Sequence, residues 1–595
     1  MSNHALRSTA AVQLPVRQAA ALIWRSLRHR CSGRLALPSQ PAFAITVAMI
    51  WTFGYNLAFW QQAIAAMWQP SVGSLLFFIS LALLVVTLHV TLLLCIPTRR
   101  LMQAVAAALF IVAAPSSHFC HAYGAIFNQD MLRNVLQTDR AEIGGLLGAG
   151  SLLHFCLLGI IPAALSWHVT LPASRWTTQL QQRGMLLVIA WLLTLASMVA
   201  AAASYAVFFR EYKPIRYTAV PAAPLASALG LALSQRGHGS QGPLLDVGGK
   251  VQHVGAVAAR PLVIFMVVGE TARAESFALG GYQRPTNPRL MGEKSVAYFD
   301  HAKSCGTSTA ISVPCMFSPF DRSHFEVRDA ARYLNLLDTL ARNGFAVEWR
   351  DNNAGCKGVC ARIKTIQYQP PLDPGLCDRA NCHDEIMLQD LAAKLRTVRQ
   401  DSVIVFHQIG SHGPAYAERY PARFELFKPA CHSKELQHCS ADEVRNAYDN
   451  TIVYTDYVLS RQIELLRAAA DHLDTVLIYA SDHGESLGER GLYLHGMPYA
   501  FAPQQQKSVP MLIWTSASLR ARIGLDPTCL QSHAHDAVSH DNLYHTLLGV
   551  AGLRNAVYDA SLDLTAACRR SPASPYAAPS ELSRPHAADV ATGSS

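Results

Sequence analysis

The distribution of apolar residues divides the chain into two parts near residue 208. The first part holds five long apolar runs that contain no Asp, Glu, Lys or Arg, at 41–61, 74–96, 101–120, 147–169 and 185–208. A helix that crosses the hydrocarbon core of a bilayer needs about 20 mostly apolar residues, and each run reaches that length. The pattern therefore predicts an all-α transmembrane domain of five helices over residues 41–208.

Arginines mark one side of this domain. They gather in the segment 1–40 and in the loops after the second and the fourth apolar run. Because loops rich in Lys and Arg stay in the cytoplasm, these three segments are expected on the cytoplasmic side. The sequence thus predicts a basic cytoplasmic extension over 1–40, and it puts everything after residue 208 across the membrane. The extension is too long and too rich in Arg for a signal peptide, so we expect 41–61 to be a retained anchor.

Composition agrees with a membrane protein. Of 595 residues, 51% are hydrophobic and only 15% are charged, against about 25% charged in an average protein. These values exclude a wholly cytosolic enzyme, a disordered chain and a small disulfide scaffold, and the length exceeds one compact domain. The net charge of +9 is explained by arginines that flank the spans and face anionic lipid, so we expect a membrane and no nucleic acid as partner.

Three segments lack a pattern of buried residues. Residues 209–260 contain four prolines and the stretch QRGHGSQGP, which indicates a bridging linker. Residues 569–595 are rich in Pro, Ser and Ala, which is typical of a disordered tail. The loop 121–146 is polar, and its residues 129–142 form either an amphipathic helix at the membrane surface or a solvated connector.

Between residues 261 and 568, short apolar runs alternate with helical patterns. PLVIFMVVGE at 261–270 is apolar almost throughout, as expected of a strand that is buried on both faces. We therefore expect an α/β domain with a mainly parallel sheet. Ligands bind at the carboxyl ends of such strands, and Glu270, His412 and the pair Asp482–His483 lie at the ends of these runs.

These run ends carry residue types that bind metals. The carboxylates of Glu270 and Asp482 beside the imidazole of His483 suit Zn²⁺ or a similar ion, and a polar turn after a strand is the alternative. The segment CGTSTAISVPC adds hydroxyl groups at 307–309. A hydroxyl at a helix N-terminus near a metal can act as a nucleophile, and simple N-capping is the alternative.

The cysteines favour an oxidising compartment. Ten of the 14 lie after residue 300, on the side expected to be outside the cytoplasm. An even number of cysteines there predicts disulfides. A zinc site built from Cys356, Cys360, Cys377 and Cys382 is the alternative, because zinc knuckles use similar spacings. Spacing alone leaves the pairing open.

Six long motifs carry a resemblance to a known family. They are VVGETARAESFALGGYQRPTNPRL, SCGTSTAISVPCMFS, WRDNNAGCKGVC, IGSHGPAYAERYP, YDNTIVYTDY and LIYASDHGESLGERGLYLHGMPYA. These motifs resemble phosphoethanolamine transferases of the EptA/MCR type, and the five-span domain and the loop NQDMLRNVLQTD match too. The resemblance implies a catalytic domain similar to alkaline phosphatases and sulfatases. It also implies a multi-pass protein of the bacterial inner membrane with this domain in the periplasm.

The resemblance implies a zinc-dependent catalytic site. Glu270, Thr309, Asp482 and His483 match the zinc-ligand positions of the family, and Thr309 also matches its nucleophile. Glu485 lies near the metal in the family pattern and is expected to be catalytic. One tightly bound Zn²⁺ is the implied cofactor, and a second, weaker one is left open.

Further positions match the family's contacts with the transferred group. Asn353, Lys357, His412 and His495 match residues near the phosphoethanolamine, and the two histidines are also expected to protonate the leaving group and to touch the second zinc. The resemblance pairs most of the cysteines and leaves the last two as a fifth pair: Cys305–Cys315, Cys356–Cys360, Cys377–Cys382, Cys431–Cys439 and Cys529–Cys568.

The implied reaction moves phosphoethanolamine from phosphatidylethanolamine to a lipid A phosphate through a covalent intermediate on Thr309. It would lower the negative surface charge and give resistance to polymyxin and other cationic peptides. The alternatives are an acceptor on lipopolysaccharide core sugar or periplasmic glucan, a phosphoglycerol transferase or sulfatase-like hydrolase, and a non-catalytic membrane sensor. No oligomer is predicted.

Overall fold

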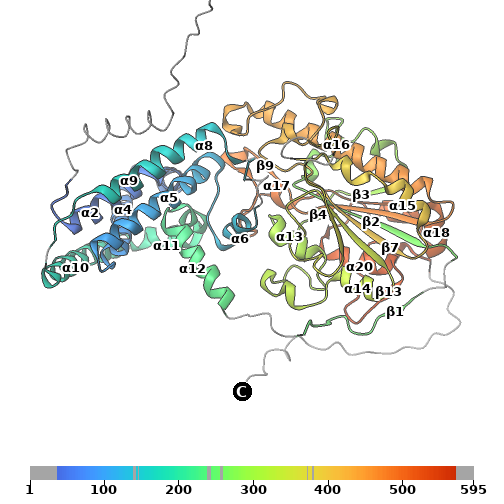
Figure 1. Cartoon of the computed structure of the whole chain (residues 1–595), viewed down its shortest axis with the longest axis horizontal. Helices are drawn as coiled ribbons and strands as arrows, with labels where there is room; N and C mark the ends of the chain where they lie inside the picture. The colour runs from blue at the N-terminus through green and yellow to red at the C-terminus, as the bar shows by residue number, and fades with distance from the viewer. Residues whose placement is uncertain are drawn as a thin grey trace, which may run out of the picture. The chain divides into compact units, whose positions relative to one another are not determined.

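The computed structural model describes residues 36–570 except 139–142, 145, 174, 237–242, 255–258, 371–372 and 378–380 (Figure 1). Most of the predicted extension 1–40 and nearly all of the predicted tail 569–595 lie outside the described residues. The chain separates into two compact units. Of the described residues, the first unit takes in those up to Arg133, those within 147–237 and Gly488–Tyr493, and the second unit takes in the others.

The first unit is helical. It contains α2 (Gln40–Met49), the π-helical turn η1 (Ile50–Gly54), α3 (Leu57–Met67), α4 (Val72–Leu94), α5 (Arg99–Tyr123), α8 (Ala149–His154), the π-helical turn η2 (Phe155–Ile160), α9 (Ile161–His168), α10 (Trp176–Ala200), α11 (Ala202–Glu211), the 3₁₀ turn η3 (Lys213–Thr218) and α12 (Ala222–Arg236). The polar loop after α5 forms α6 (Gln129–Gln137). The segment predicted as a linker therefore begins with helical structure.

The first apolar run is not one straight helix. It forms two helical segments, Gln40–Gly54 and Leu57–Met67, which are bent by 61° relative to each other. Asn56 is buried at the break, where its amide donates to the carbonyl oxygens of Trp51 (2.8 Å) and Val220 (2.7 Å). These bonds give the two carbonyl groups a donor at the point where the regular backbone hydrogen bonds of the helix are interrupted. Among the described residues, four helices are long and apolar enough to span a membrane, or five if the bent pair is one span.

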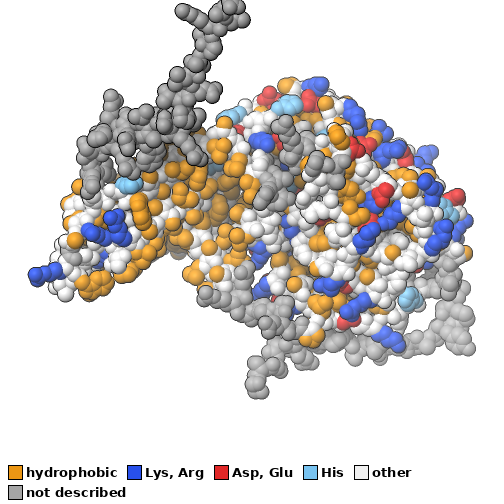
Figure 2. Space-filling view, in the orientation of Figure 1, with side chains coloured by type: hydrophobic (Ala, Val, Ile, Leu, Met, Phe, Trp, Pro, Cys, Tyr) orange, Lys and Arg blue, Asp and Glu red, His pale blue; other side chains and the backbone are white. Residues whose placement is uncertain are grey.

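The outer surface of these helices is apolar (Figure 2). Large side chains that are more than half exposed include Ile79, Leu157, Leu192 and Val199. A soluble protein rarely exposes so large an apolar surface, whereas lipid tails solvate it without cost. The packing thus supports a membrane location for this unit.

The second unit is built on a seven-stranded sheet of order β3-β11-β8-β2-β7-β5-β6. The strands are β2 (Leu262–Gly269), β3 (Val296–Phe299), β5 (Ala346–Asp351), β6 (Lys364–Gln367), β7 (Ser402–His407), β8 (Asp474–Ser481) and β11 (Met511–Thr515). Every residue of the central strands β2 and β8 is buried. This burial explains why both strands appear in the sequence as continuous apolar runs.

The sheet is mixed, where the sequence predicted a mainly parallel one. The neighbours β8, β2, β7, β5 and β6 are parallel, but β11 runs antiparallel to both β8 and β3. β11 follows β8 through an irregular segment that contains only short elements, so the chain returns in the opposite direction. An apolar run buried on both faces carries no signal for its direction.

Helices cover both faces of this sheet (Figure 1). On one face lie α13 (Thr309–Met316), α14 (Leu336–Arg342) and α20 (Asp541–Val550), and on the other lie α15 (Leu391–Thr397) and the long α16 (Ala441–Ala468). Alternate residues of β2 face opposite layers, and Ile264 and Val268 join one core with Leu337 and Leu547.

Shorter elements complete the second unit. They include β1 (Gln252–His253) with β13 (Leu553–Arg554), β4 (Ala302–Lys303) with β12 (Val538–Ser539), β9 (Ser486–Leu487), α17 (Gln504–Lys507), α18 (Ala517–Ile523) and α19 (Pro527–Ser532). The last named pair of strands, β4 and β12, is parallel and links the segment before α13 to the segment before α20.

Five disulfides staple the second unit. The bonded pairs are Cys305–Cys315, Cys356–Cys360, Cys377–Cys382, Cys431–Cys439 and Cys529–Cys568. They are the pairs that the family resemblance implies. The alternative zinc site at Cys356, Cys360, Cys377 and Cys382 is wrong, because all four thiols are used in disulfide bonds.

Candidate active site

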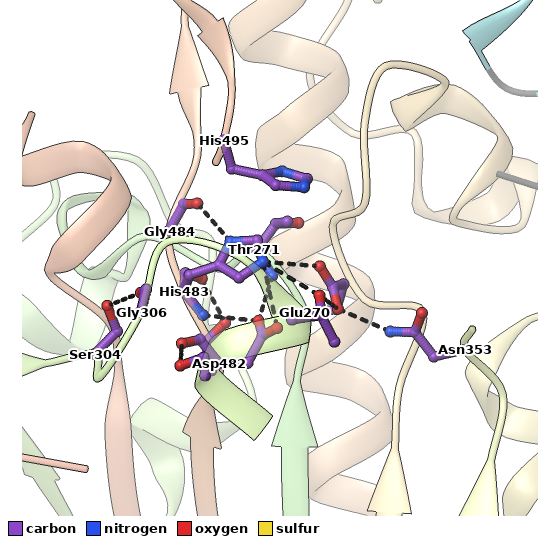
Figure 3. Close-up of polar contacts among 12 residues, drawn as sticks. Glu270, Thr271, Ser304, Gly306, Asn353, Asp482, His483, Gly484 and His495 are labelled. Atoms are coloured by element: carbon purple, nitrogen blue, oxygen red, sulfur yellow. Dashed lines mark hydrogen bonds and ion pairs between the residues drawn. The ribbon is translucent and has the colours of Figure 1, made fainter. Parts of the chain in front are cut away.

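Two neighbouring strand ends bring the predicted metal ligands together. Gly269 of β2 pairs with Ser481 of β8, so Glu270 and Asp482 are the first residues past two adjacent parallel strands. Both carboxylates and the ring of His483 are fully buried. His483 Nε2 lies 3.4 Å from Glu270 Oε1 and 3.3 Å from Asp482 Oδ2 (Figure 3).

The end of β8 explains how Asp482 and His483 serve one site. In a continuing strand, adjacent side chains would point to opposite faces, but β8 ends at Ser481. Gly484 is required next, because a Cβ atom there would collide with the carbonyl oxygen of Gln505. Thr271 N donates to Asp482 Oδ1 (3.2 Å), so the loop after β2 also orients this carboxylate.

The residues of this cluster fit a cation. Glu270 Oε1 and Asp482 Oδ2 are buried and accept no hydrogen bond from the described residues. One ligand atom from each of Glu270, Asp482 and His483 lies within 4.8 Å of the others. Two carboxylates and an imidazole are donors that zinc and similar ions prefer.

Electrostatics supports the same interpretation. Burial, and then the charge of Glu270, raises the pKa of Asp482 well above its ordinary value. Burial, and then the nearby His495, lowers the pKa of His483 to about 3. The imidazole is therefore neutral and able to bind a cation, which would also relieve the repulsion between the carboxylates.

Thr309 is the hydroxyl that reaches this cluster. It is the first residue of α13, and its Oγ1 lies 3.1 Å from Glu270 Oε2 and 3.3 Å from His483 Nε2. Ser308 occupies the N-cap position, but its side chain makes no capping bond. Simple helix capping therefore does not account for the hydroxyls of this segment. The Cys305–Cys315 disulfide ties the loop before Thr309 to the end of α13.

Two histidines and a glutamate lie beside the cluster. The ring of His495 is 4.4 Å from that of His483 and 5.5 Å from that of His412, measured between centroids. His495 Nδ1 is 3.3 Å from Oε1 of the fully buried Glu485, whose pKa is raised by burial. His412 is not at a strand end as the sequence suggested. β7 ends at His407, and a turn that packs on the Glu270 backbone brings His412 back.

Of the two remaining predicted residues, Asn353 and Lys357, only the first contacts the cluster. Asn353 reaches the cluster, where its Nδ2 donates to Glu270 Oε2 and to Gln408 O, both at 2.8 Å. Lys357 is partly exposed, and its Nζ donates to Ala354 O (2.8 Å) rather than to a cluster residue. Lys357 therefore belongs to the rim of the site.

Two buried aspartates, which the sequence analysis did not identify, fix the loops that carry His412 and Asn353. Asp384 accepts hydrogen bonds from the backbone of Ile409 (2.9 Å) and Gly410 (3.0 Å). Asp351 accepts from the backbone of Asn353 (3.0 Å) and Gly355 (3.2 Å). The end of β5 gave a signal for Asp351, whereas Asp384 follows no apolar run.

Comparison with known proteins covers both units. The family model described as Sulfatase matches residues 262–553, and the model described as Phosphoethanolamine transferase EptA/EptB matches residues 83–236. Phosphoethanolamine transferase EptA of Escherichia coli (strain K12) is 36% identical over 554 residues, which are 92% of this chain and 100% of that protein. Phosphatidylethanolamine transferase Mcr-1 of Escherichia coli is 37% identical over 459 residues, 76% of this chain and 83% of that protein.

A solved structure agrees with these relatives. The integral membrane protein lipooligosaccharide phosphoethanolamine transferase A (EptA) from Neisseria meningitidis superimposes with a TM-score of 0.86 at 32% identity. The match covers 90% of this chain and 100% of that one. Together with the apolar helices, it supports the predicted multi-pass protein of the bacterial inner membrane with a periplasmic α/β domain. The chain belongs to the EptA/Mcr family of phosphoethanolamine transferases.

Proposed function

We propose that this transferase moves phosphoethanolamine from phosphatidylethanolamine to a phosphate of lipid A, through a covalent ester on Thr309. The observation that carries the proposal is the Thr309 hydroxyl, which lies within hydrogen-bonding distance of Glu270 and His483 in a buried cluster. Family membership supports the transferred group. The name of the relative Mcr-1 supports the donor lipid.

Zinc is the proposed cofactor. Glu270, Asp482 and His483, with Thr309 Oγ1 as the fourth donor, would hold one tightly bound Zn²⁺. When bound, the ion lowers the pKa of a coordinated hydroxyl and offsets negative charge on a phosphoryl group. A second, weaker zinc is proposed beside His412 and His495.

The reaction consists of two displacements at phosphorus. In the first, Thr309 loses its hydroxyl proton to solvent, Oγ1 bonds to phosphorus, and the bond from phosphorus to the glycerol oxygen breaks. Diacylglycerol leaves with a proton from His412 or His495. In the second, an oxygen of a lipid A phosphate bonds to the same phosphorus, the Thr309 ester breaks, and Thr309 Oγ1 takes a proton back from solvent. Two displacements give ping-pong kinetics and net retention at phosphorus.

The surrounding residues have complementary roles in this scheme. Asn353 and Lys357 would donate hydrogen bonds to the phosphoryl oxygens, where negative charge develops in the transition state. Glu485 would orient His495 by accepting a hydrogen bond from its Nδ1, so that proton transfer would take place at Nε2. The product carries an amine on a lipid A phosphate, which would weaken the binding of polymyxin and other cationic peptides.

Mass spectrometry of lipid A tests the proposal. The wild type and Thr309→Ala are expressed in a Gram-negative host that lacks its own transferase. The expected result is a phosphoethanolamine increment on lipid A with the wild type only. An increment with Thr309→Ala would overturn the assignment of Thr309 as the nucleophile. No increment on lipid A, with the protein present in the membrane, would overturn the proposal that lipid A is the acceptor. Core sugar and periplasmic glucan would then be analysed for the same increment.

A further inference from the structure

His540 lies buried under the proposed active site and joins two of its parts. It precedes α20, and only 1% of its surface is exposed. Its Nε2 is 2.9 Å from the carbonyl oxygen of Ser481, and its Nδ1 is 3.1 Å from the backbone nitrogen of Cys305. A carbonyl only accepts and an amide N–H only donates, so the proton must be on Nε2.

The imidazole is kept neutral, as these two bonds require. Burial lowers the pKa of His540 to about 4, so at neutral pH the ring carries one proton. A protonated ring would direct a second N–H at the amide of Cys305. The neutral ring instead donates at Nε2 and accepts at Nδ1, which satisfies both backbone groups.

The two residues that His540 contacts are close in sequence to the proposed metal ligands and to the nucleophile. Ser481 is the residue before Asp482 and His483, and its Oγ also donates to His483 O (3.0 Å). Cys305 begins the loop that ends at Thr309. One turn into α13, Ser312 donates to the carbonyl oxygen of Asp482 and lies 3.3 Å from His540 Nδ1.

The loop that carries Thr309 is outside the main sheet. The strand before it, β4, pairs with β12 rather than with the strands that end at Glu270 and Asp482. The position of Thr309 relative to Asp482 therefore depends on bonds such as those of His540 and Ser312. In-line attack is sensitive to shifts of about 1 Å, so such bonds affect rate strongly.

We propose that His540 is a positioning residue for the transfer reaction, and that its neutral imidazole holds the Thr309 loop in register with Asp482 and His483. The proposal rests on the proposed function in taking Thr309 as the nucleophile. The bridge itself does not depend on the identity of the donor or the acceptor.

Three variants of His540 separate the effects of its two hydrogen bonds, to Ser481 O and from Cys305 N. His540→Phe keeps a ring of similar shape and removes both bonds. His540→Gln keeps a donor near Nε2 for Ser481, and His540→Asn keeps an acceptor near Nδ1 for Cys305. His545→Phe is the matched control, because His545 is also buried in α20 but its Nδ1 accepts from Asp559 N (3.0 Å), in the segment after β13.

Kinetics of the full-length protein in detergent, with phosphatidylethanolamine as donor, give the first readout. Each lost hydrogen bond is expected to lower kcat about tenfold. His540→Phe should therefore lose about a hundredfold in kcat, with each single-bond variant between it and the wild type. The KM for the donor should change less than about twofold in all of them. His545→Phe should keep its kcat even where its melting temperature falls as far as that of His540→Phe.

Hydrogen–deuterium exchange gives a second readout that needs no activity. Peptides covering 305–309 should exchange faster in His540→Phe and His540→Gln, and should remain protected in His540→Asn and His545→Phe. Failure of the wild type to transfer phosphoethanolamine would count against the proposed function and leave this readout intact. A wild-type kcat in His540→Phe, or unchanged protection of 305–309, would overturn the role of His540.

Discussion

Replacing Asp482 with Asn is expected to stabilise the metal-free protein and to weaken its binding of zinc. The two effects have one cause. Asp482 and Glu270 are both fully buried, and without a cation nothing in the pair offsets their mutual repulsion. An amide of the same shape removes one charge and one strong metal ligand together.

The size of the effect follows from the separation of the two carboxylates. Their ligand oxygens lie within 4.8 Å of each other. At that distance two unit charges repel by about 3.5 kcal/mol with an effective dielectric constant of about 20. Part of this repulsion is relieved when Asp482 takes up a proton, in line with its raised pKa. We therefore expect Asp482→Asn to raise the free energy of unfolding of the metal-free protein by about 2 kcal/mol.

Thermal unfolding of the full-length protein in detergent measures this gain. After removal of metal with a chelator, Asp482→Asn should unfold about 4 °C or more above the wild type. Added zinc should raise the melting temperature of the wild type and have little effect on the variant. A metal-free variant that melts below the metal-free wild type would show that the two buried carboxylates do not destabilise the folded protein through repulsion.

Asp449→Asn is the control for this experiment. Asp449 is also fully buried, but its Oδ2 accepts from Arg284 Nη1 (2.5 Å) and from the Tyr282 hydroxyl (2.9 Å). Its replacement leaves a cation without its partner carboxylate, so this variant should be less stable with and without zinc. The opposite signs of the two substitutions separate repulsion at the site from the general effect of removing a buried carboxylate.

Three further predictions concern residues around the site. Asn353→Ala should lower kcat about tenfold or more while zinc binding, measured by metal analysis, stays at the wild-type stoichiometry; loss of zinc would instead make Asn353 part of the metal site. The double variant Cys305→Ser/Cys315→Ser should lose about 2 to 3 kcal/mol in stability, because it opens the loop that carries Thr309, and unchanged denaturant unfolding would contradict this. Burial raises the pKa of Asp456 from 3.8 to about 6, although backbone N–H groups of Leu290 and Arg289 donate to it. A carboxyl group with a raised pKa in the folded state favours folding most below pH 3.8, and this contribution is lost as pH rises through 6. Relative to Asp456→Asn, the wild type should therefore lose about 2.4 kcal/mol of stability between pH 4 and pH 7, as measured by denaturant unfolding; a difference that does not change with pH would refute the shift.

The candidate metal ligands could be predicted from sequence because their position depends on local patterns. Continuous apolar runs predict buried strands, and Glu270 and Asp482 are the first polar residues after two of them. Parallel neighbours end at one edge of a sheet, so the two carboxylates meet there. Thr309 needed a second clue, the flanking cysteines, and its role came from the family resemblance.

Other features depend on tertiary contacts that leave no periodic signal. His540 lies in a short polar segment, and its importance follows only from the two backbone groups that it joins. The bend lies at Asn56, whose side chain hydrogen-bonds to Val220, 164 residues away in the sequence. The direction of β11 is set by the chain path after β8, because an apolar run is the same in either direction.

Direct detection of the covalent intermediate tests the central claim most closely. The full-length protein is incubated with phosphatidylethanolamine in the absence of lipid A, quenched in acid, digested and analysed by tandem mass spectrometry. We expect a phosphoethanolamine ester on Thr309 that disappears when lipid A is added, and no ester in Thr309→Ala. Transfer to lipid A by Thr309→Ala, or an ester on another residue that turns over at the rate of transfer, would contradict it.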